Sequence, residues 1–129
     1  MHRELAPAGL AAPAANYALA VLSTNVERMV HTAGVVPTRP DGTVPTDIGE
    51  QATVVWETIA ALLESAEMTP ANIVSVTTYV VAEHLPELGV VMAARDRALG
   101  EHRAASTLVT VPALAQSAWK LEIAVIATA

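Results

Sequence analysis

The sequence predicts an α+β fold in which two helices pack on one face of a single mixed β-sheet. Runs rich in β-branched residues alternate with two stretches of helical spacing, in the order ββαβαββ. Several runs, such as LEIAVIA and TLVTV, are apolar at consecutive positions, which is typical of strands covered on both faces. The face without helices therefore needs a partner, and a closed cyclic oligomer with ligand clefts between its subunits is the simplest cover.

The length of 129 residues suits one domain, so residues 1–129 are expected to form a single unit with residues 1–14 as an extended N-terminal arm. The first two strands are expected at YALAVLS, residues 17–23, and RMVHTAGVVP, residues 28–37. The short polar break TNVE between them favours an antiparallel hairpin. RPDG at 39–42 predicts a turn that ends the second strand.

Two segments show helical spacing. The first begins at a cap formed by Thr46 or Asp47, and its expected inward residues are Ala52, Val55, Ile59, Leu62, Leu63 and Ala66. The second has Pro86 in its first turn, ends near Leu99 and is followed by Gly100. Its expected inward residues are Leu85, Leu88, Met92 and Leu99.

Three further strands are expected at residues 73–81, 106–111 and 119–127, where β-branched residues are frequent. In the last of them, alternation places Leu121, Ile123 and Val125 on one face, and Glu122, Ala124 and Ile126 on the other. A carboxylate among such apolar neighbours is expected to have a raised pKa, which suits a general acid or base.

Composition excludes several classes of function. Apolar residues make up 53% of the chain, the net charge is −6, and no cluster of Lys and Arg appears, so nucleic acid is not an expected partner. There is no Cys, the four His lie far apart and the glycines are scattered, so no metal and no nucleotide cofactor are expected. Without a signal peptide pattern or a run of membrane-spanning length, we expect a soluble, cytoplasmic protein.

Five segments in order, NYALAV, TAGVVP, DIGEQATVVWETIAALLESA, IVSVTTYVV and KLEIAVIA, resemble the RidA (YjgF) family. Its members are described as enamine/imine deaminases or, historically, as endoribonuclease L-PSP. The resemblance implies a chorismate-mutase-like fold and a homotrimer whose sheets form an inner barrel. It also implies three small-molecule pockets at the interfaces between subunits.

In family members that deaminate, a Pro-Ala-Arg segment presents an arginine to the carboxylate of a 2-imino acid, and a glutamate near the C-terminus helps to position water. HRAASTLVTV, residues 102–111, can be aligned with that segment in two registers. With Arg103 as the clamp, the following strand carries four extra residues, whereas with Ser106 at the arginine position only one is needed. The second register resembles a branch of the family that lacks the arginine, and it makes Arg103 a solvated residue at the end of the helix.

The resemblance also places the other site residues. Glu122 is the expected acid/base, although a structural carboxylate is an equal alternative. Tyr17 and Ser106 are expected to orient the substrate; the alternatives are that Tyr17 covers the sheet edge and that Ser106 is an ordinary strand serine. The expected substrate-binding positions are Ala33, Gly34, Val35, Met92 (or Val91 if the register slips by one), Arg103 and Thr107. Because Ala33-Gly34-Val35 stands where Ser-Gly-Gln is usual, this pocket is more apolar than that of the deaminases.

These residues leave two functions open. The first is an enzyme acting on an imine, an enamine or a related tautomerisable metabolite. The second is a non-catalytic protein that binds a small ligand or supports a partner enzyme. A third, ribonuclease activity, is disfavoured by the negative charge.

Overall fold

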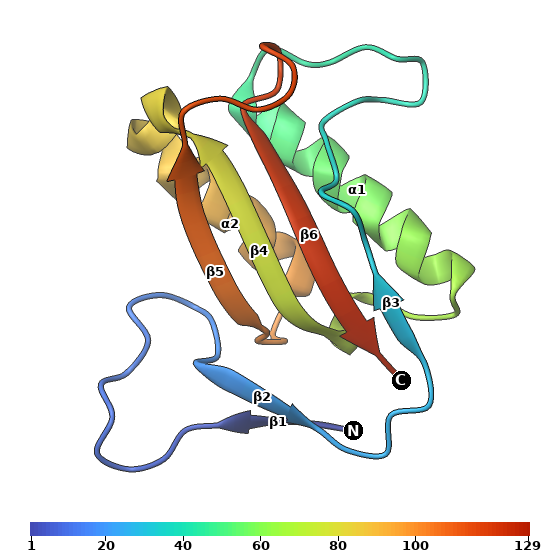
Figure 1. Ribbon diagram of the computed structural model, residues 1–129, viewed down its shortest axis with the longest axis vertical. Coiled ribbons are helices and arrows are strands. Elements are labelled where there is room, and N and C mark those ends of the chain that lie inside the picture. The colour runs from blue at the N-terminus through green and yellow to red at the C-terminus, as the bar shows by residue number, and fades with distance from the viewer.

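The computed structural model describes residues 1–129. Its elements, in chain order, are β1 (His2–Leu5), β2 (Ala20–Ser23), β3 (Met29–His31), α1 (Ile48–Ser65), β4 (Ile73–Val81), α2 (Leu88–Leu99), β5 (Ala105–Val111) and β6 (Leu121–Thr128). Short 3₁₀ turns at Pro70–Asn72 and Ala82–Glu87 lead into β4 and α2 respectively. Figure 1 shows the long central strands with α1 and α2 behind or beside them.

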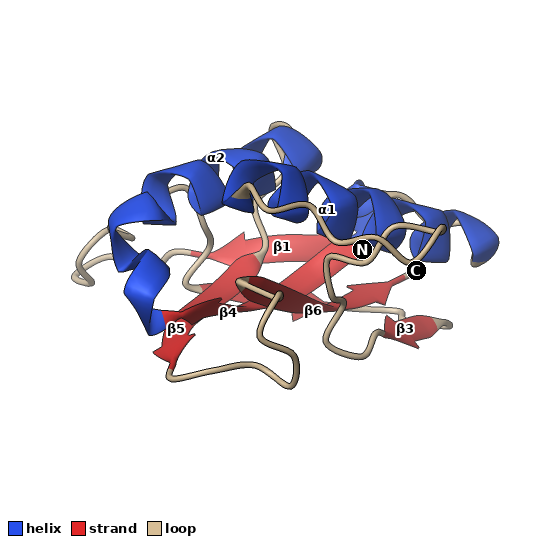
Figure 2. Ribbon diagram, turned by 90° about the horizontal axis from the view of Figure 1, so that it is seen from above, coloured by secondary structure: helices blue, strands red, loops and turns tan.

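The main sheet has four strands in the order β3-β6-β4-β5, in which β4 and β5 are parallel and the other pairs antiparallel. Both helices lie on one face of this sheet, as seen edge-on in Figure 2. The prediction of an α+β fold with a mixed sheet and two helices on one face is therefore confirmed. The observed order differs from ββαβαββ by the additional strand β1, and β1 and β2 form a separate two-stranded sheet instead of joining the main one.

The predicted hairpin between residues 17–23 and 28–37 is wrong. The partner of β2 is β1, with Leu5 opposite Ala20, so a strand forms inside the expected N-terminal arm. After β2 the chain turns away from that strand, because the backbone N–H groups of Glu27 and Arg28 both donate to the carbonyl of Ala129. Residues after this point therefore pair with the C-terminal strand β6 instead of folding back on β2.

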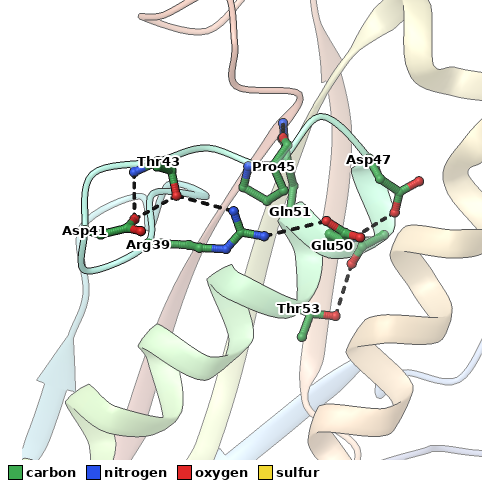
Figure 3. A network of polar contacts seen from close by, with 9 residues as sticks. Arg39, Asp41, Thr43, Pro45, Asp47, Glu50, Gln51 and Thr53 are labelled. Carbon is green, nitrogen blue, oxygen red and sulfur yellow. Dashed lines mark hydrogen bonds and ion pairs between the residues drawn. The ribbon is translucent and has the colours of Figure 1, made fainter.

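The loop between β3 and α1 is held by a polar network (Figure 3). The carboxylate of Asp41 accepts from the backbone N–H of Thr43 at 3.0 Å and from its hydroxyl at 2.7 Å. These two bonds lower the pKa of Asp41 from its usual value. Gly42 has a φ of 88°, as the predicted turn requires, and Arg39 reaches Glu50 on α1 at 3.6 Å.

Of the two expected caps of α1, the structure uses Asp47, whose carboxylate accepts from the backbone N–H of Glu50 at 2.9 Å. One turn further on, Gln51 is fully buried. Its side-chain amide donates to the carbonyls of Pro45 (2.7 Å) and Ala118 (2.9 Å), and its oxygen accepts from the N–H of Lys120 (2.9 Å). A single side chain thus fixes the start of α1 against the loop that leads into β6.

The core lies between the helices and the sheet. Most of the predicted inward residues of α1 are buried, but Leu62 is 43% exposed, because Leu63 beside it takes the core position. The prediction for Leu85 is wrong, since its side chain is 54% exposed. It lies in the 3₁₀ turn that precedes α2, where the spacing of an α-helix does not apply.

Candidate functional site

One set of predicted site residues meets in a pocket between α2 and the edge strand β5, which we call the helix-side pocket. It has a volume of about 210 Å³ and is lined by Ala15, Tyr17, Leu88, Met92, Arg95, Ser106 and Leu108. The structure therefore brings together Tyr17, Met92 and Ser106, which lie far apart in the sequence. Apart from the hydroxyls of Tyr17 and Ser106 and the guanidinium of Arg95, the walls of the pocket are apolar.

The register of β5 explains why Ser106 points into this pocket. Ser106 lies opposite Val76 of β4, whose side chain is buried beneath the helices, so both residues face α2. The segment with Tyr17 reaches the same place because the backbone N–H of Ala18 donates to the carbonyl of Ala104 at 3.0 Å. Residues 15–18 thus close the pocket along the free edge of β5.

Arg95 is a pocket residue that is not among the predicted site residues. It is only 5% exposed, and its Nη1 donates to the hydroxyl of Ser106 at 3.4 Å. Its Nε and Nη2 donate to Oδ1 of Asp96 at 3.2 and 3.1 Å. The sequence carries a signal for it, because Leu88, Met92, Arg95 and Leu99 follow one another at spacings of four, three and four on one helix face.

Arg103 lies outside the helix-side pocket. Its guanidinium donates to the backbone carbonyl of Tyr17 and forms an ion pair with Glu4 of β1 at 3.1 Å. With 36% of its side chain exposed, it is not the freely solvated residue expected at the helix end. It holds the N-terminal strand and the Tyr17 backbone in place, so its effect on the pocket is indirect.

Glu122 lies on the opposite face of the sheet, which carries no helix. It pairs with Tyr79 of β4, and Thr107 is exposed on the same face of β5. Gly34 lies directly against Glu122: a Cβ at residue 34 would be 1.8 Å from the carboxylate oxygen Oε2. The absence of a side chain at Gly34 is therefore what makes room for this carboxylate.

The pairing of residues 32–35 with β6 sets this arrangement. The backbone of Val35 exchanges hydrogen bonds with Ile123 at 2.7 and 3.1 Å, and the Val35 side chain is buried in the core. Gly34, the next residue back, consequently faces the other side of the sheet. Of the trio predicted to bind substrate, Ala33 is exposed, Gly34 adjoins Glu122, and Val35 packs beneath the helices.

The predicted catalytic residues thus form two half-sites. Tyr17 and Ser106 lie on the helix side of β5, whereas Glu122 and Gly34 lie on the other face of the sheet. The strand β4 separates β5 from β6, so within one chain the two groups do not meet.

Two further properties of the chain bear on its chemistry. No three His, Asp or Glu side chains are grouped so that they could hold a metal ion. Neither helix is long and apolar enough to cross a membrane.

Sequence comparison connects the chain with a known family. The family model described as endoribonuclease L-PSP matches residues 9–129. A RutC family protein of Haemophilus influenzae is 37% identical over 81 residues, a region that spans 62% of this chain and 57% of that protein.

Solved structures of similar fold cover nearly the whole chain. The Rid family protein YyfB of Yersinia pestis, described as being of unknown function, superposes with a TM-score of 0.87 at 27% identity, over 99% of this chain and 98% of the other. TdcF of Escherichia coli, solved with bound serine, superposes with a TM-score of 0.73 at 25% identity, over 94% of this chain and 91% of the other.

Proposed function

This chain belongs to the endoribonuclease L-PSP (RidA/YjgF) family, and from that premise we propose that it forms a homotrimer that hydrolyses a small imine or enamine in clefts between subunits. One observation carries this proposal. The Glu122 carboxylate lies on the open sheet face in a space that exists only because residue 34 is glycine. A carboxylate placed so specifically suits proton transfer at a bound ligand.

The two half-sites support an assembly in which each cleft is built by two subunits. If the sheet face that carries Glu122 in a second copy packed beside the helix-side pocket of the first, Glu122 would lie next to Tyr17 and Ser106. Within one chain these residues are separated. Exposed apolar side chains, including Leu19 (43%), Leu22 (40%) and Val109 (41%), favour such burial. In this arrangement the uncovered face of the sheet lines the inside of the trimer.

In the proposed reaction, Glu122 acts as general base and then as general acid. Its carboxylate takes a proton from water as the water oxygen attacks the imine carbon, and it returns that proton to the nitrogen. The carboxylate then takes the hydroxyl proton of this carbinolamine and passes it to the nitrogen, so that the C–N bond breaks, a ketone forms and ammonia leaves. An enamine enters the same route after protonation of its carbon, while Tyr17 and Ser106 hold the substrate in place.

The test is the rate at which 2-iminopropionate, generated in situ, disappears with purified protein. Wild type is expected to accelerate hydrolysis over buffer, and Glu122→Gln to lose roughly 10²–10⁴-fold of that rate, the usual contribution of a positioned acid/base. The exposed helix residue Glu64 gives the matched control Glu64→Gln, which is expected to leave the rate unchanged. A wild-type rate equal to that of buffer would remove this activity.

A non-catalytic ligand-binding protein is the second proposal, and the residues at the family's polar positions favour it. Ser106 stands at the arginine position of the deaminases, and Met92 makes the same pocket apolar. TdcF was solved with serine bound, so a small ligand in this fold needs no turnover to be held. Saturable binding without turnover would support this alternative, whereas salt-dependent RNA binding and cleavage would refute both proposals.

A further inference from the structure

The helix-side pocket contains a buried cation whose surroundings do not use all of its donors. Only 7% of the Arg95 side chain is exposed, and burial of a charged group is costly unless the group is paired. Its one charged partner, Asp96, has a side chain that is 41% exposed, so water screens that carboxylate. Asp96 therefore binds the guanidinium from the solvent side and leaves the pocket side to other acceptors.

A count of its hydrogen bonds shows which N–H groups of Arg95 have no acceptor. A guanidinium has five N–H groups. In this chain Asp96 accepts from Nε and from one N–H of Nη2, and the hydroxyl of Ser106 accepts from one N–H of Nη1 at the long distance of 3.4 Å. One N–H on each terminal nitrogen has no acceptor within the chain. Such a pair of N–H groups matches the two oxygens of a carboxylate.

The rest of the pocket limits the size and character of the ligand. Its volume of about 210 Å³ is below the range of about 300–1,000 Å³ that is typical of sites for drug-sized molecules. Leu88, Met92 and Leu108 supply the apolar part of the pocket lining beside the cation. The pocket therefore suits a compound of a few carbon atoms with one negative end and one apolar end.

We propose that Arg95 is the residue that binds the carboxylate of the ligand, with the Ser106 hydroxyl as a second donor. The cation that binds the carboxylate then lies on α2, whereas the arginine of the deaminating family members aligns with the start of β5. This inference rests on the proposed function for the identity of the pocket and deepens it by naming the residue of this chain that takes the carboxylate. The binding step itself requires no turnover, so it can be tested separately.

The experiment compares two unreactive probes, propionate and the neutral propionamide, by calorimetry and by NMR titration of the wild-type protein. Wild type is expected to bind propionate more tightly than propionamide. Arg95→Met, which keeps an apolar side chain of similar length, is expected to lose roughly ten-fold or more of its affinity for propionate and none for propionamide. The matched control is Arg97→Met on the exposed side of the same helix, which is expected to bind both probes like wild type.

Two further variants keep the inference testable if Arg95→Met does not fold. Arg95→Lys retains the charge but not the paired N–H groups, and Ser106→Ala removes the second donor, so each is expected to weaken propionate binding and to spare propionamide. Equal binding of the two probes by wild type, or unchanged propionate binding in Arg95→Lys and Ser106→Ala, overturns the inference. If the protein binds propionate but does not hydrolyse 2-iminopropionate, only the proposed function is overturned. If it hydrolyses 2-iminopropionate but does not bind propionate more tightly than propionamide, only the role of Arg95 is overturned.

Discussion

A methyl group added at Gly34 would occupy the space in which the Glu122 carboxylate lies. The Cβ of Gly34→Ala would be 1.8 Å from Oε2 and 3.0 Å from the carboxylate carbon of Glu122. Ordinary van der Waals contact begins near 3.4 Å, so the oxygen must retreat by roughly 1.5 Å. The backbone at Gly34 does not have a positive φ, so alanine can adopt it without strain.

The consequence for stability should be small, because a flexible side chain can move away from the new methyl group. The consequence for activity should be large, since a displacement of about 1 Å at a reacting group can reduce a rate by about 10²-fold. We therefore expect Gly34→Ala to melt within a few degrees of wild type and to hydrolyse 2-iminopropionate about 10²-fold more slowly. Thermal unfolding and the single-turnover rate measure the two effects separately.

A second substitution checks the cause. Glu122→Asp shortens the side chain by one methylene and draws the carboxylate back from residue 34. Combined with Gly34→Ala, it should recover part of the lost rate, whereas alone it should lower the rate. Full activity in Gly34→Ala would refute the reasoning, because it would show that the position of Glu122 beside Gly34 does not matter for the reaction.

Three further predictions concern stability. Gln51→Leu leaves the buried carbonyl of Pro45 and the part-buried carbonyl of Ala118 and N–H of Lys120 without their partner, so urea unfolding should show a loss of about 2 kcal/mol. A loss below about 1 kcal/mol would contradict the bonding described for Gln51. Asp47→Ala removes the cap of α1 and should cost about 1 kcal/mol in the same assay, whereas Asp47→Asn should cost much less. Burial, the terminal ammonium and His102 lower the pKa of His2 from 6.5, so the contribution of His2 to stability is complete above pH 6.5 and is lost as the pH falls through its folded value. Hydrogen-exchange protection of β1 should therefore decrease on acidification from pH 7.5 to 5, and it should not do so in His2→Gln.

The parts of the fold that could be predicted are those that local pattern determines. In β6, Leu121, Ile123 and Val125 are buried and Glu122 and Ala124 are less so, as the alternation of the sequence indicates. The sequence predicts the start of α1 within two residues of its observed position, because the apolar spacing and the cap agree. These features depend on neighbours in the chain and therefore appear in the sequence.

The parts that could not be predicted depend on contacts between distant residues. The pairing of β1 with β2 joins residues about twenty positions apart through an arm with no strand pattern, and nothing in YALAVLS indicates its partner. The local sequence offers two roles for Arg103, a substrate clamp and a solvated residue at the helix end, whereas its place in the structure is decided by Glu4 near the other end of the chain. Arg95 is not expected in the site from its residue type, because an arginine in a helix usually lies on the solvent side, although its spacing from Met92 places it inward.

The central claim is that each catalytic cleft is built from two copies of the chain, one supplying Glu122 and the other supplying Tyr17 and Ser106. The most direct measurement is the rate of 2-iminopropionate hydrolysis after two variants that each lack one half of the cleft, Glu122→Gln and the double variant Tyr17→Phe/Ser106→Ala, are unfolded together and refolded as mixed oligomers. If the cleft is shared, about a quarter of the clefts in a random mixture combine the two intact halves, and a corresponding part of the wild-type rate returns. A mixture no more active than the two variants measured separately would contradict the account.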